Sequence, residues 1–332
     1  MTAAVAASTP SAHRGIRPVE PRHDMAALAG LIERAFSERL DASGRRMILG
    51  MKAFARAGRL GWFVGHWFLP PAAYPQGFVW EEEGTVVGNA SLLPVRGFQQ
   101  RWVMANVVVK PEYQRRGIAR ALVLASIDHV RRSGGRWIML QVDRDNCGAR
   151  TLYANLDFKT LTTRTTWARK GKRERFPVVS QGQARPRTSG EWREQWALAK
   201  RLHPEGLLWP FPTVASLFRP SGFENLLALG MPKHWVWQED GRIIGAVSIK
   251  PEIERRLWRL MMVVEPEKRG EVESSLLINA MQESSGLAGD FILDYPSEVA
   301  AGTIKGLGFK AIRELTWMGM KLENSDIQGE GH

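Results

Sequence analysis

A basic segment around Gly117 has the residue types of an anion-binding turn. It reads Val107-Val-Val-Lys-Pro-Glu-Tyr-Gln-Arg-Arg-Gly-Ile-Ala-Arg-Ala-Leu122. The valine-rich stretch predicts a buried strand that ends at Pro111, and a helix is expected to begin near Gly117. The backbone N–H groups from Gln114 to Ala119 would then point outward at a positively polarised helix N-terminus, where a phosphate binds well. A plain basic turn in solvent is the other interpretation, and the residue types alone leave both open.

A second segment, Asn146-Cys-Gly-Ala-Arg-Thr-Leu-Tyr-Ala-Asn-Leu-Asp-Phe158, holds the candidate for acid chemistry. Tyr153 carries a phenol that can donate a proton to a departing thiolate. Its other interpretation is a tyrosine packed on a helix face, with its hydroxyl bound to water. Asn146 is suited to cap a helix, and equally to bond a ligand amide. Cys147 is interpreted as structural, because no base partner for it is evident.

The elements that must position these residues alternate between strands and helices. Apolar residues at helical spacing predict a helix over 21–40, and an acidic turn with glycine predicts a hairpin over 78–94. The other expected elements are a strand at 15–19, a helix at 47–57, strands at 102–109 and 137–142, helices at 117–132 and 146–156, and final strands within 158–169. This order indicates a mixed α/β domain with one strand–helix–strand crossover.

The pattern of the first half recurs in the second. The matching blocks are 78–88 with 235–245, 108–112 with 263–267, 156–159 with 307–310, and 166–167 with 316–317. Because the blocks keep their order, each repeat is expected to be a whole domain rather than a solenoid unit. The expected boundaries are a disordered tail at 1–14, a domain at 15–170, a linker at 171–188, a second domain at 189–322 and a tail at 323–332.

The second repeat has lost the features that make the first a candidate site. Its loop reads Pro266-Glu-Lys-Arg-Gly-Glu-Val-Glu273. An alignment without a gap places Val272 at the position of Gly117, whereas a two-residue deletion would place Gly270 there. In both alignments Glu271 and Glu273 bring negative charge, and Ile304 stands where the first repeat has Tyr153. The second repeat is therefore expected to be structural.

Composition and charge favour a globular protein whose first half attracts anions. The 332 residues are 44% hydrophobic and 24% charged, and the single cysteine fits a reducing cytoplasm. The first 172 residues hold 26 Lys and Arg against 13 Asp and Glu, whereas the remainder holds 20 against 21. The positive charge therefore lies in the half that carries the candidate anion site. No apolar run reaches the roughly 20 residues of a membrane helix, and the N-terminus does not resemble a secretion signal.

Both motifs resemble hallmarks of the GNAT acetyltransferases. Gln114 to Ala119 is similar to that family's Gln/Arg-x-x-Gly-x-Gly/Ala pyrophosphate loop, and Asn146 to Phe158 is similar to Asn-x-x-Ala-x-x-Leu-Tyr-x-x-x-Gly-Phe, with Asp157 in place of the usual glycine. The resemblance implies two tandem GNAT-like domains, each a twisted mixed sheet flanked by helices. It also implies acetyl-CoA as cosubstrate, direct transfer to an amine, and Tyr153 as the general acid.

The resemblance further implies which residues contact the cofactor. The expected cofactor-binding residues are Val107, Val108, Val109, Gln114, Arg115, Arg116, Gly117, Ile118, Ala119 and Asn146. The strand residues would supply backbone groups to pantetheine, and one N–H would polarise the acetyl carbonyl. No metal is expected. A general base is not evident, and water relayed by Glu33 or His66 is one possibility.

The expected function is an acetyl-CoA-dependent N-acetyltransferase of the cytoplasm that acts on an unidentified amine of a small molecule or peptide. Tandem GNAT chains include enzymes that resemble mycothiol synthase, but no residue selects that branch. A non-catalytic acyl-CoA-binding module is one alternative, and Tyr153 argues against it. A nucleic-acid-binding protein is a second, less favoured alternative, because the basic half shows no helix-turn-helix, zinc or RNP pattern.

Overall fold

The computed structural model describes residues 14–37, 42–68, 76–171, 184–208, 211–220, 232–251, 257–282 and 289–323. The chain forms two compact units. The first unit comprises Met1–Val95, Gln99–Leu140 and Met320–His332, and the second unit comprises Arg96–Phe98 and Gln141–Gly319. The expected domain boundaries near 170 and 189 follow the order of the repeats along the chain and stay a prediction.

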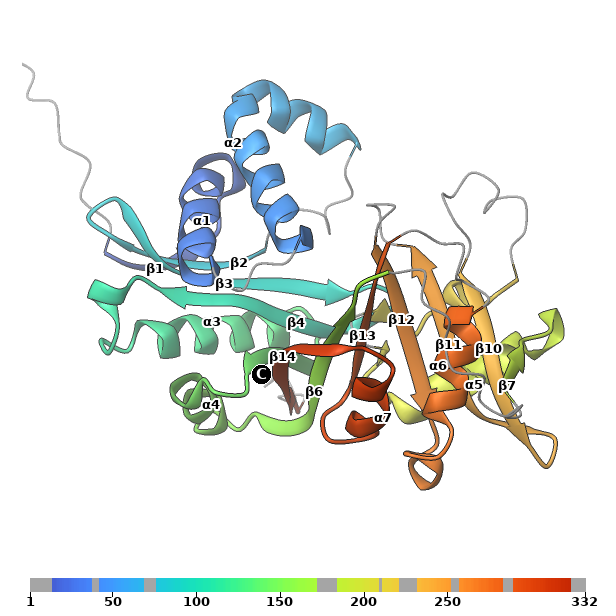
Figure 1. The fold of residues 1–332 in the computed structure, drawn as a ribbon. Coiled ribbons are helices and arrows are strands. Elements are labelled where there is room, and N and C mark those ends of the chain that lie inside the picture. Colours follow the sequence, from blue (N-terminus) through green and yellow to red (C-terminus); the bar gives the residue numbers. More distant parts are fainter. Residues whose placement is uncertain are drawn as a thin grey trace, which may run out of the picture. The chain divides into compact units, whose positions relative to one another are not determined.

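The first unit contains an open sheet that carries the candidate loop (Figure 1). Its strands lie in the order β1 (Gly15–Pro18), β2 (Gln76–Glu82), β3 (Thr85–Val95), β4 (Phe98–Val109) and β5 (Trp137–Asp143). The β2–β3 hairpin is antiparallel, as expected, whereas β4 pairs in parallel with β5. A parallel pair needs a crossover connection, and α3 (Ile118–Arg132) supplies it.

Helices cover both faces of this sheet because its central strands are apolar on both sides (Figure 1). Val86 and Val108 pack with α1 (Pro21–Phe36), whereas their neighbours Val87 and Val109 pack with α3. This alternation follows from the two-residue period of a strand. The helix expected at 47–57 is longer in the structure, since α2 spans Ala42–Phe68. The side chains of the aromatic stretch 61–68 lie outside the described residues.

An ion-pair network fixes α1 to the edge of the sheet. Arg17 on β1 bonds both oxygens of Asp24 on α1 at 2.7 and 2.9 Å, and its Nε donates to Glu81 on β2 at 2.7 Å. The Asp24 side chain is only 3% exposed. Hydrogen bonding to Asp24, together with Glu81, raises the pKa of Arg17 above its ordinary value. The network therefore holds the helix that forms one wall of the candidate site.

Replacing Arg17 with methionine is expected to lower the free energy of unfolding by about 3 kcal/mol, because it leaves a buried, unpaired charge on Asp24. Urea unfolding measures the change. Arg131→Met is the matched control, because Arg131 pairs with Asp128 on an exposed face and such pairs contribute only about 0–1 kcal/mol. Equal effects of the two substitutions would contradict a structural role for the network.

The second unit contains the other strands, in the order β14-β6-β13-β12-β11-β10-β7. The bounds are β6 (Lys159–Arg169), β7 (Ala184–Pro186), β10 (Lys233–Glu239), β11 (Arg242–Pro251), β12 (Leu257–Val264), β13 (Asp290–Pro296) and β14 (Lys310–Lys321), with a separate pair β8 (Leu207–Leu208) and β9 (Phe211–Pro212). The helices are α4 (Cys147–Ala154), α5 (Trp192–Leu202), α6 (Glu273–Gln282) and α7 (Ala301–Gly306).

Strand β6 lies between two strands of the second repeat. It pairs antiparallel with β13 from Arg164↔Pro296 to Arg169↔Phe291, and antiparallel with β14 on its other side. The last strand of the first repeat is therefore built into the sheet of the second unit. Experiments on either repeat need the full chain, because a cut between the repeats would remove a central strand.

Local contacts recur in the two hairpins, as the repeated sequence predicts. Trp80 Nε1 donates to Glu82 at 3.1 Å, and Trp237 Nε1 donates to Glu239 at 3.1 Å. Each hairpin also shifts register directly after that tryptophan. Within the part of the chain that the structure describes, no helix combines the length and the apolar character needed to span a bilayer.

Candidate functional site

The segment between β4 and α3 forms the turn that the sequence suggested. After Val109 the chain makes a short turn at Pro111–Tyr113, and α3 then begins at Ile118. Two residues take left-handed backbone conformations, Arg115 with φ 62° and Gly117 with φ 80°. A Cβ on Gly117 would meet no atom within 4 Å. The glycine is therefore required by its backbone angle and by whatever occupies the open space, not by packing within the chain.

The backbone N–H groups of this turn form an open donor set. In the described residues, those from Arg115 to Arg120 have no acceptor, and the first helical bond runs from Ala121 N–H to Gly117 O at 3.0 Å. The N–H of Gln114, which was expected to belong to the set, instead donates to Pro111 O within the turn. Residues 114–117 are exposed. Exposed donors at a helix N-terminus suit a phosphate.

Two side chains of the turn hold its shape. Gln114 Nε2 donates to Val109 O at 3.0 Å, which ties the turn to the end of β4. Arg116 donates to Glu112 O at 2.9 Å, and its guanidinium lies over the Tyr113 ring. These contacts assign Gln114 and Arg116 a role in positioning the donors.

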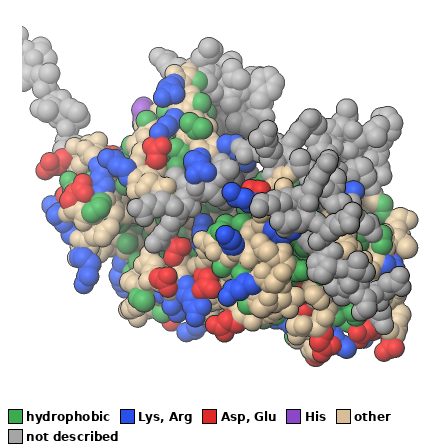
Figure 2. All heavy atoms as spheres, viewed as in Figure 1, with side chains coloured by type: hydrophobic (Ala, Val, Ile, Leu, Met, Phe, Trp, Pro, Cys, Tyr) green, Lys and Arg blue, Asp and Glu red, His purple; other side chains and the backbone are tan. Residues whose placement is uncertain are grey.

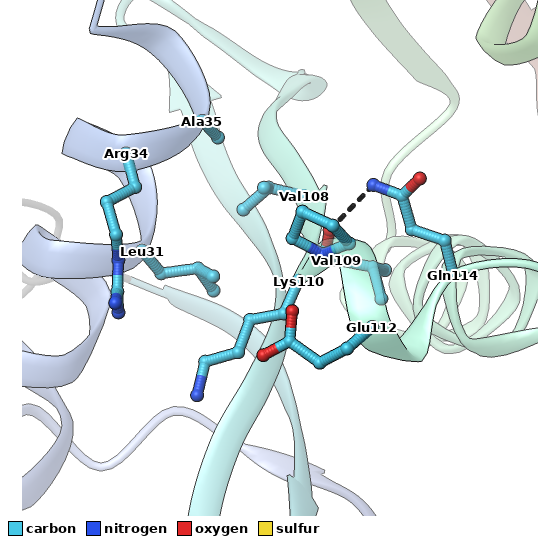
Figure 3. Close-up of a pocket in the computed structure, with 9 residues that line it drawn as sticks. Leu31, Arg34, Ala35, Val108, Val109, Lys110, Glu112 and Gln114 are labelled. Atoms are coloured by element: carbon cyan, nitrogen blue, oxygen red, sulfur yellow. Dashed lines mark hydrogen bonds between the residues drawn. The ribbon is translucent and has the colours of Figure 1, made fainter.

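A pocket of about 420 Å³ lies beside the turn (Figure 3). Leu31, Arg34 and Ala35 of α1 line one side, and Val108 to Glu112 together with Gln114 line the other. Its size lies within the ~300–1,000 Å³ of small-ligand sites. Neither Arg34 nor Lys110 was among the expected site residues, although both line this pocket. No sequence pattern places α1 beside the end of β4, because only the packing of α1 on the sheet brings them together.

Strand β4 is continuous but has one irregular residue, Asn106, which we call its break and which precedes the expected cofactor-binding valines. The ladder between β4 and β5 pairs Arg101↔Trp137 through Met104↔Leu140, and Asn106 then takes φ 51°. The Asn89 side chain on β3 donates to Asn106 O at 2.8 Å. Neither asparagine was among the expected site residues, although an asparagine inside a valine-rich strand is the signal that could have found the break.

The residues of the second motif lie in the second unit. Asn146 caps α4 by accepting a hydrogen bond from the Ala149 N–H at 3.1 Å, which agrees with the prediction of a helix cap. Tyr153 is 5% exposed and contacts Phe158 edge-on at 5.8 Å. Burial raises the pKa of Tyr153 to about 12, so its phenol stays protonated at neutral pH.

The departure from the family pattern at Asp157 leaves the backbone turn intact. Asp157 has φ 66°, and Gly308 at the same place in the second repeat has φ 83°. Aspartate is among the residues that tolerate this left-handed region. Of the two residues considered for a base relay, Glu33 pairs with Lys52 at 2.7 Å, and the His66 side chain lies outside the described residues.

The corresponding turn of the second repeat is closed by its own side chains. Leu276 N–H donates to Val272 O as Ala121 N–H does to Gly117 O, so the ungapped alignment is correct. Gly270 N–H donates to Glu273 Oε2 at 2.8 Å, and the Tyr295 hydroxyl donates to Glu273 Oε1 at 2.7 Å. The buried Glu273 carboxylate thus accepts the N–H of Gly270, whose counterpart in the first repeat, the N–H of Arg115, is open.

The equivalence of Tyr153 and Ile304 also holds in the structure. Phe158 N–H donates to Tyr153 O at 3.1 Å, and Phe309 N–H donates to Ile304 O at 3.3 Å. The second repeat therefore has an aliphatic side chain where the first has a phenol. Across the described residues, no group of three or more His, Cys, Asp and Glu is arranged to hold a metal ion.

Comparison with known proteins confirms the family resemblance. Residues 53–158 match the model of the acetyltransferase (GNAT) family. The mycothiol acetyltransferase of Kocuria rhizophila is 32% identical over 149 residues, which are 43% of this chain and 45% of that protein. The [ribosomal protein bS18]-alanine N-acetyltransferase of Escherichia coli K12 is 37% identical over 62 residues, 19% of this chain and 42% of that protein. The chain spans less than half the length of these curated relatives.

Solved structures share the fold over nearly the whole chain. A tandem GNAT protein from the clavulanic acid biosynthesis pathway matches with a TM-score of 0.53 and 17% identity, over 95% of this chain and 100% of that one. A GCN5-related N-acetyltransferase from Sphaerobacter thermophilus matches with a TM-score of 0.55 and 16% identity, over 92% and 95% of the two chains. The expected mixed α/β GNAT fold is therefore confirmed.

Proposed function

From the GNAT acetyltransferase domain at residues 53–158, we propose that this protein transfers an acetyl group from acetyl-CoA directly to a primary amine. The observation that carries the proposal is the open set of backbone donors from Arg115 to Arg120. It suits the pyrophosphate of CoA. Lys110 and Arg34 in the adjacent pocket add positive charge for the same anionic cosubstrate.

The reaction needs one bond to form and one to break. The amine nitrogen attacks the thioester carbonyl carbon, the C–N bond forms, and the C–S bond breaks as the CoA thiolate leaves. Tyr153 supplies the proton for the thiolate, since its phenol is protonated at neutral pH. The excess proton of the attacking amine replaces it. Backbone groups of Val107 to Val109 bind the pantetheine arm and orient the thioester.

The acceptor is a primary amine of a small molecule or of a peptide N-terminus. The names of the relatives support both classes, since one group acts in mycothiol acetylation and the other on an alanine of a ribosomal protein. Nucleic acid is not favoured as a partner. Figure 2 shows Lys and Arg side chains interspersed with acidic and uncharged ones on the face in view, rather than gathered in one continuous stripe.

An acceptor screen tests the proposed function. The full chain is incubated with acetyl-CoA and with amines that include the amine precursor of mycothiol, amino acids, and peptides with N-terminal alanine, and free CoA thiol is measured. We expect thiol release that depends on one acceptor class and on Tyr153. Acetyl-CoA binding without release for any amine would instead favour a non-catalytic binding module.

We also expect one acetyl-CoA to bind per chain, because in the second repeat the Glu273 carboxylate accepts a backbone N–H of the turn and would repel a phosphate there. Calorimetry on the full chain measures the stoichiometry. Glu273→Gln should leave the stoichiometry and the affinity unchanged, since the occupied turn lies in the second repeat. Two equivalent sites per chain, or a single site lost on Glu273→Gln, would contradict this division between the repeats.

A further inference from the structure

The break in β4 is maintained by a side chain on the neighbouring strand. Asn89 is fully buried, and its Nδ2 donates to Asn106 O at 2.8 Å and to Ser91 Oγ at 3.1 Å. Asn106 Nδ2 in turn approaches Ser91 Oγ at 3.5 Å. The side-chain amide therefore bonds a backbone carbonyl of β4 at the residue where the strand is irregular.

This arrangement is unfavourable for stability by itself. Asn106 has φ 51°, which asparagine tolerates better than most residues but which a regular β-strand does not use. Asn89 Oδ1 is buried, and within the described residues it has no hydrogen-bond partner. A strand that needed only stability would keep a regular ladder with apolar residues at both positions.

The second repeat provides that regular strand. Val79↔Asn89 in the first repeat corresponds to Val236↔Ala246 in the second, so Ala246 stands where Asn89 does. Lys110 N–H donates to Val87 O, and Glu265 N–H donates to Ile244 O, which places Met261 where Asn106 is. Strands β11 and β12 pair without a shift from Gly245↔Val264 to Pro251↔Trp258, and Met261, unlike Asn106, does not take a positive φ. The irregular strand occurs together with the open turn, and the regular strand with the filled one.

We propose that Asn89 is a positioning residue, which fixes the break at Asn106 and thereby sets the backbone of Val107 to Val109 for the acyl thioester. This inference rests on the proposed acetyltransferase function. Asn89 itself touches no substrate, since it is fully buried. Its effect passes through the Asn106 carbonyl to the three valines that follow.

Asn89→Ala reproduces the residue of the second repeat and tests the inference. We expect turnover to fall about 10–100-fold, because a small misplacement of groups around the reacting atoms is costly. The affinity for CoA without an acetyl group should stay within twofold, since the turn at Gly117 is untouched. The affinity for acetyl-CoA relative to CoA should fall, and this ratio can be measured before an acceptor is known.

Ser126→Ala is the matched control for lost stability. Ser126 is fully buried in α3, and its hydroxyl donates to Leu122 O at 2.8 Å. It has no part in the strand or the turn, so turnover should stay within twofold of the parent. If Asn89→Ala reduces turnover no more than Ser126→Ala does, Asn89 is merely structural and the inference is wrong.

Two substitutions at Asn106 keep the test decisive if Asn89→Ala does not fold. Asn106→Gly retains both the carbonyl and access to positive φ, so turnover should stay within about threefold. Asn106→Met reproduces the second repeat and should lose turnover about as strongly as Asn89→Ala. Equal activity of the two variants would overturn the inference. Absence of transfer by the unsubstituted protein to every amine would instead refute the proposed function.

Discussion

Gly117→Glu is expected to weaken acetyl-CoA binding by about 100-fold, a loss near 2.7 kcal/mol. Two effects combine. Gly117 has φ 80°, which a residue with a Cβ adopts only with strain. The new carboxylate also enters the open space above the donors of the turn, where it competes with and repels a phosphate. Calorimetry with acetyl-CoA measures the affinity.

Gly134→Glu is the matched control for this substitution. Gly134 has φ 74°, and a Cβ there also meets no atom within 4 Å, but it lies just beyond the C-terminal end of α3. Both variants therefore carry the same strain and charge at opposite ends of one helix. Only Gly117→Glu should lose acetyl-CoA binding. Equal affinities in the two variants would show that the cofactor binds elsewhere.

Tyr153→Phe is expected to lower kcat by ~10²–10⁴-fold, the usual contribution of a general acid. The acetyl-CoA affinity should change little, because the substitution removes only a hydroxyl from a ring that packs on Phe158. Tyr295→Phe is the control, since it removes a buried hydroxyl that bonds Glu273 in the second repeat. Unchanged kcat in the Tyr153 variant, measured with an acceptor from the screen, would remove Tyr153 from the mechanism.

The pH dependence of the same residue supplies a second measurement. Burial raises the pKa of Tyr153 to about 12, above the value near 10 of an exposed tyrosine. Loss of the phenol proton should therefore not reduce turnover below about pH 11. The free energy of unfolding should also fall at high pH. The contribution of the neutral phenol is fully present below pH ~10 and is lost as the pH rises towards 12.

Local sequence patterns determined the elements and the candidate turn. The alternation of Val86 and Val87 predicts a strand, and the acidic residues with glycine predict a hairpin. Both patterns depend only on residues close in sequence, so they can be interpreted without knowing the fold. The spacing from Val109 to Gly117 places a strand end directly before a helix N-terminus. The position of Tyr153 within its motif predicted the candidate general acid through the family resemblance.

The tertiary structure alone decided what holds that site in shape. The contacts Arg17–Asp24, Asn89–Asn106 and Glu273–Tyr295 join residues that no local period relates. The placement of β6 between β13 and β14 is equally non-local. Strand pairing and side-chain contacts between distant segments depend on how the whole chain packs. The partner of a residue therefore cannot be predicted from its type or its neighbours in sequence. The sequence therefore predicted which residues are candidates for binding and catalysis, and the packing of the chain decided which neighbours hold them in place.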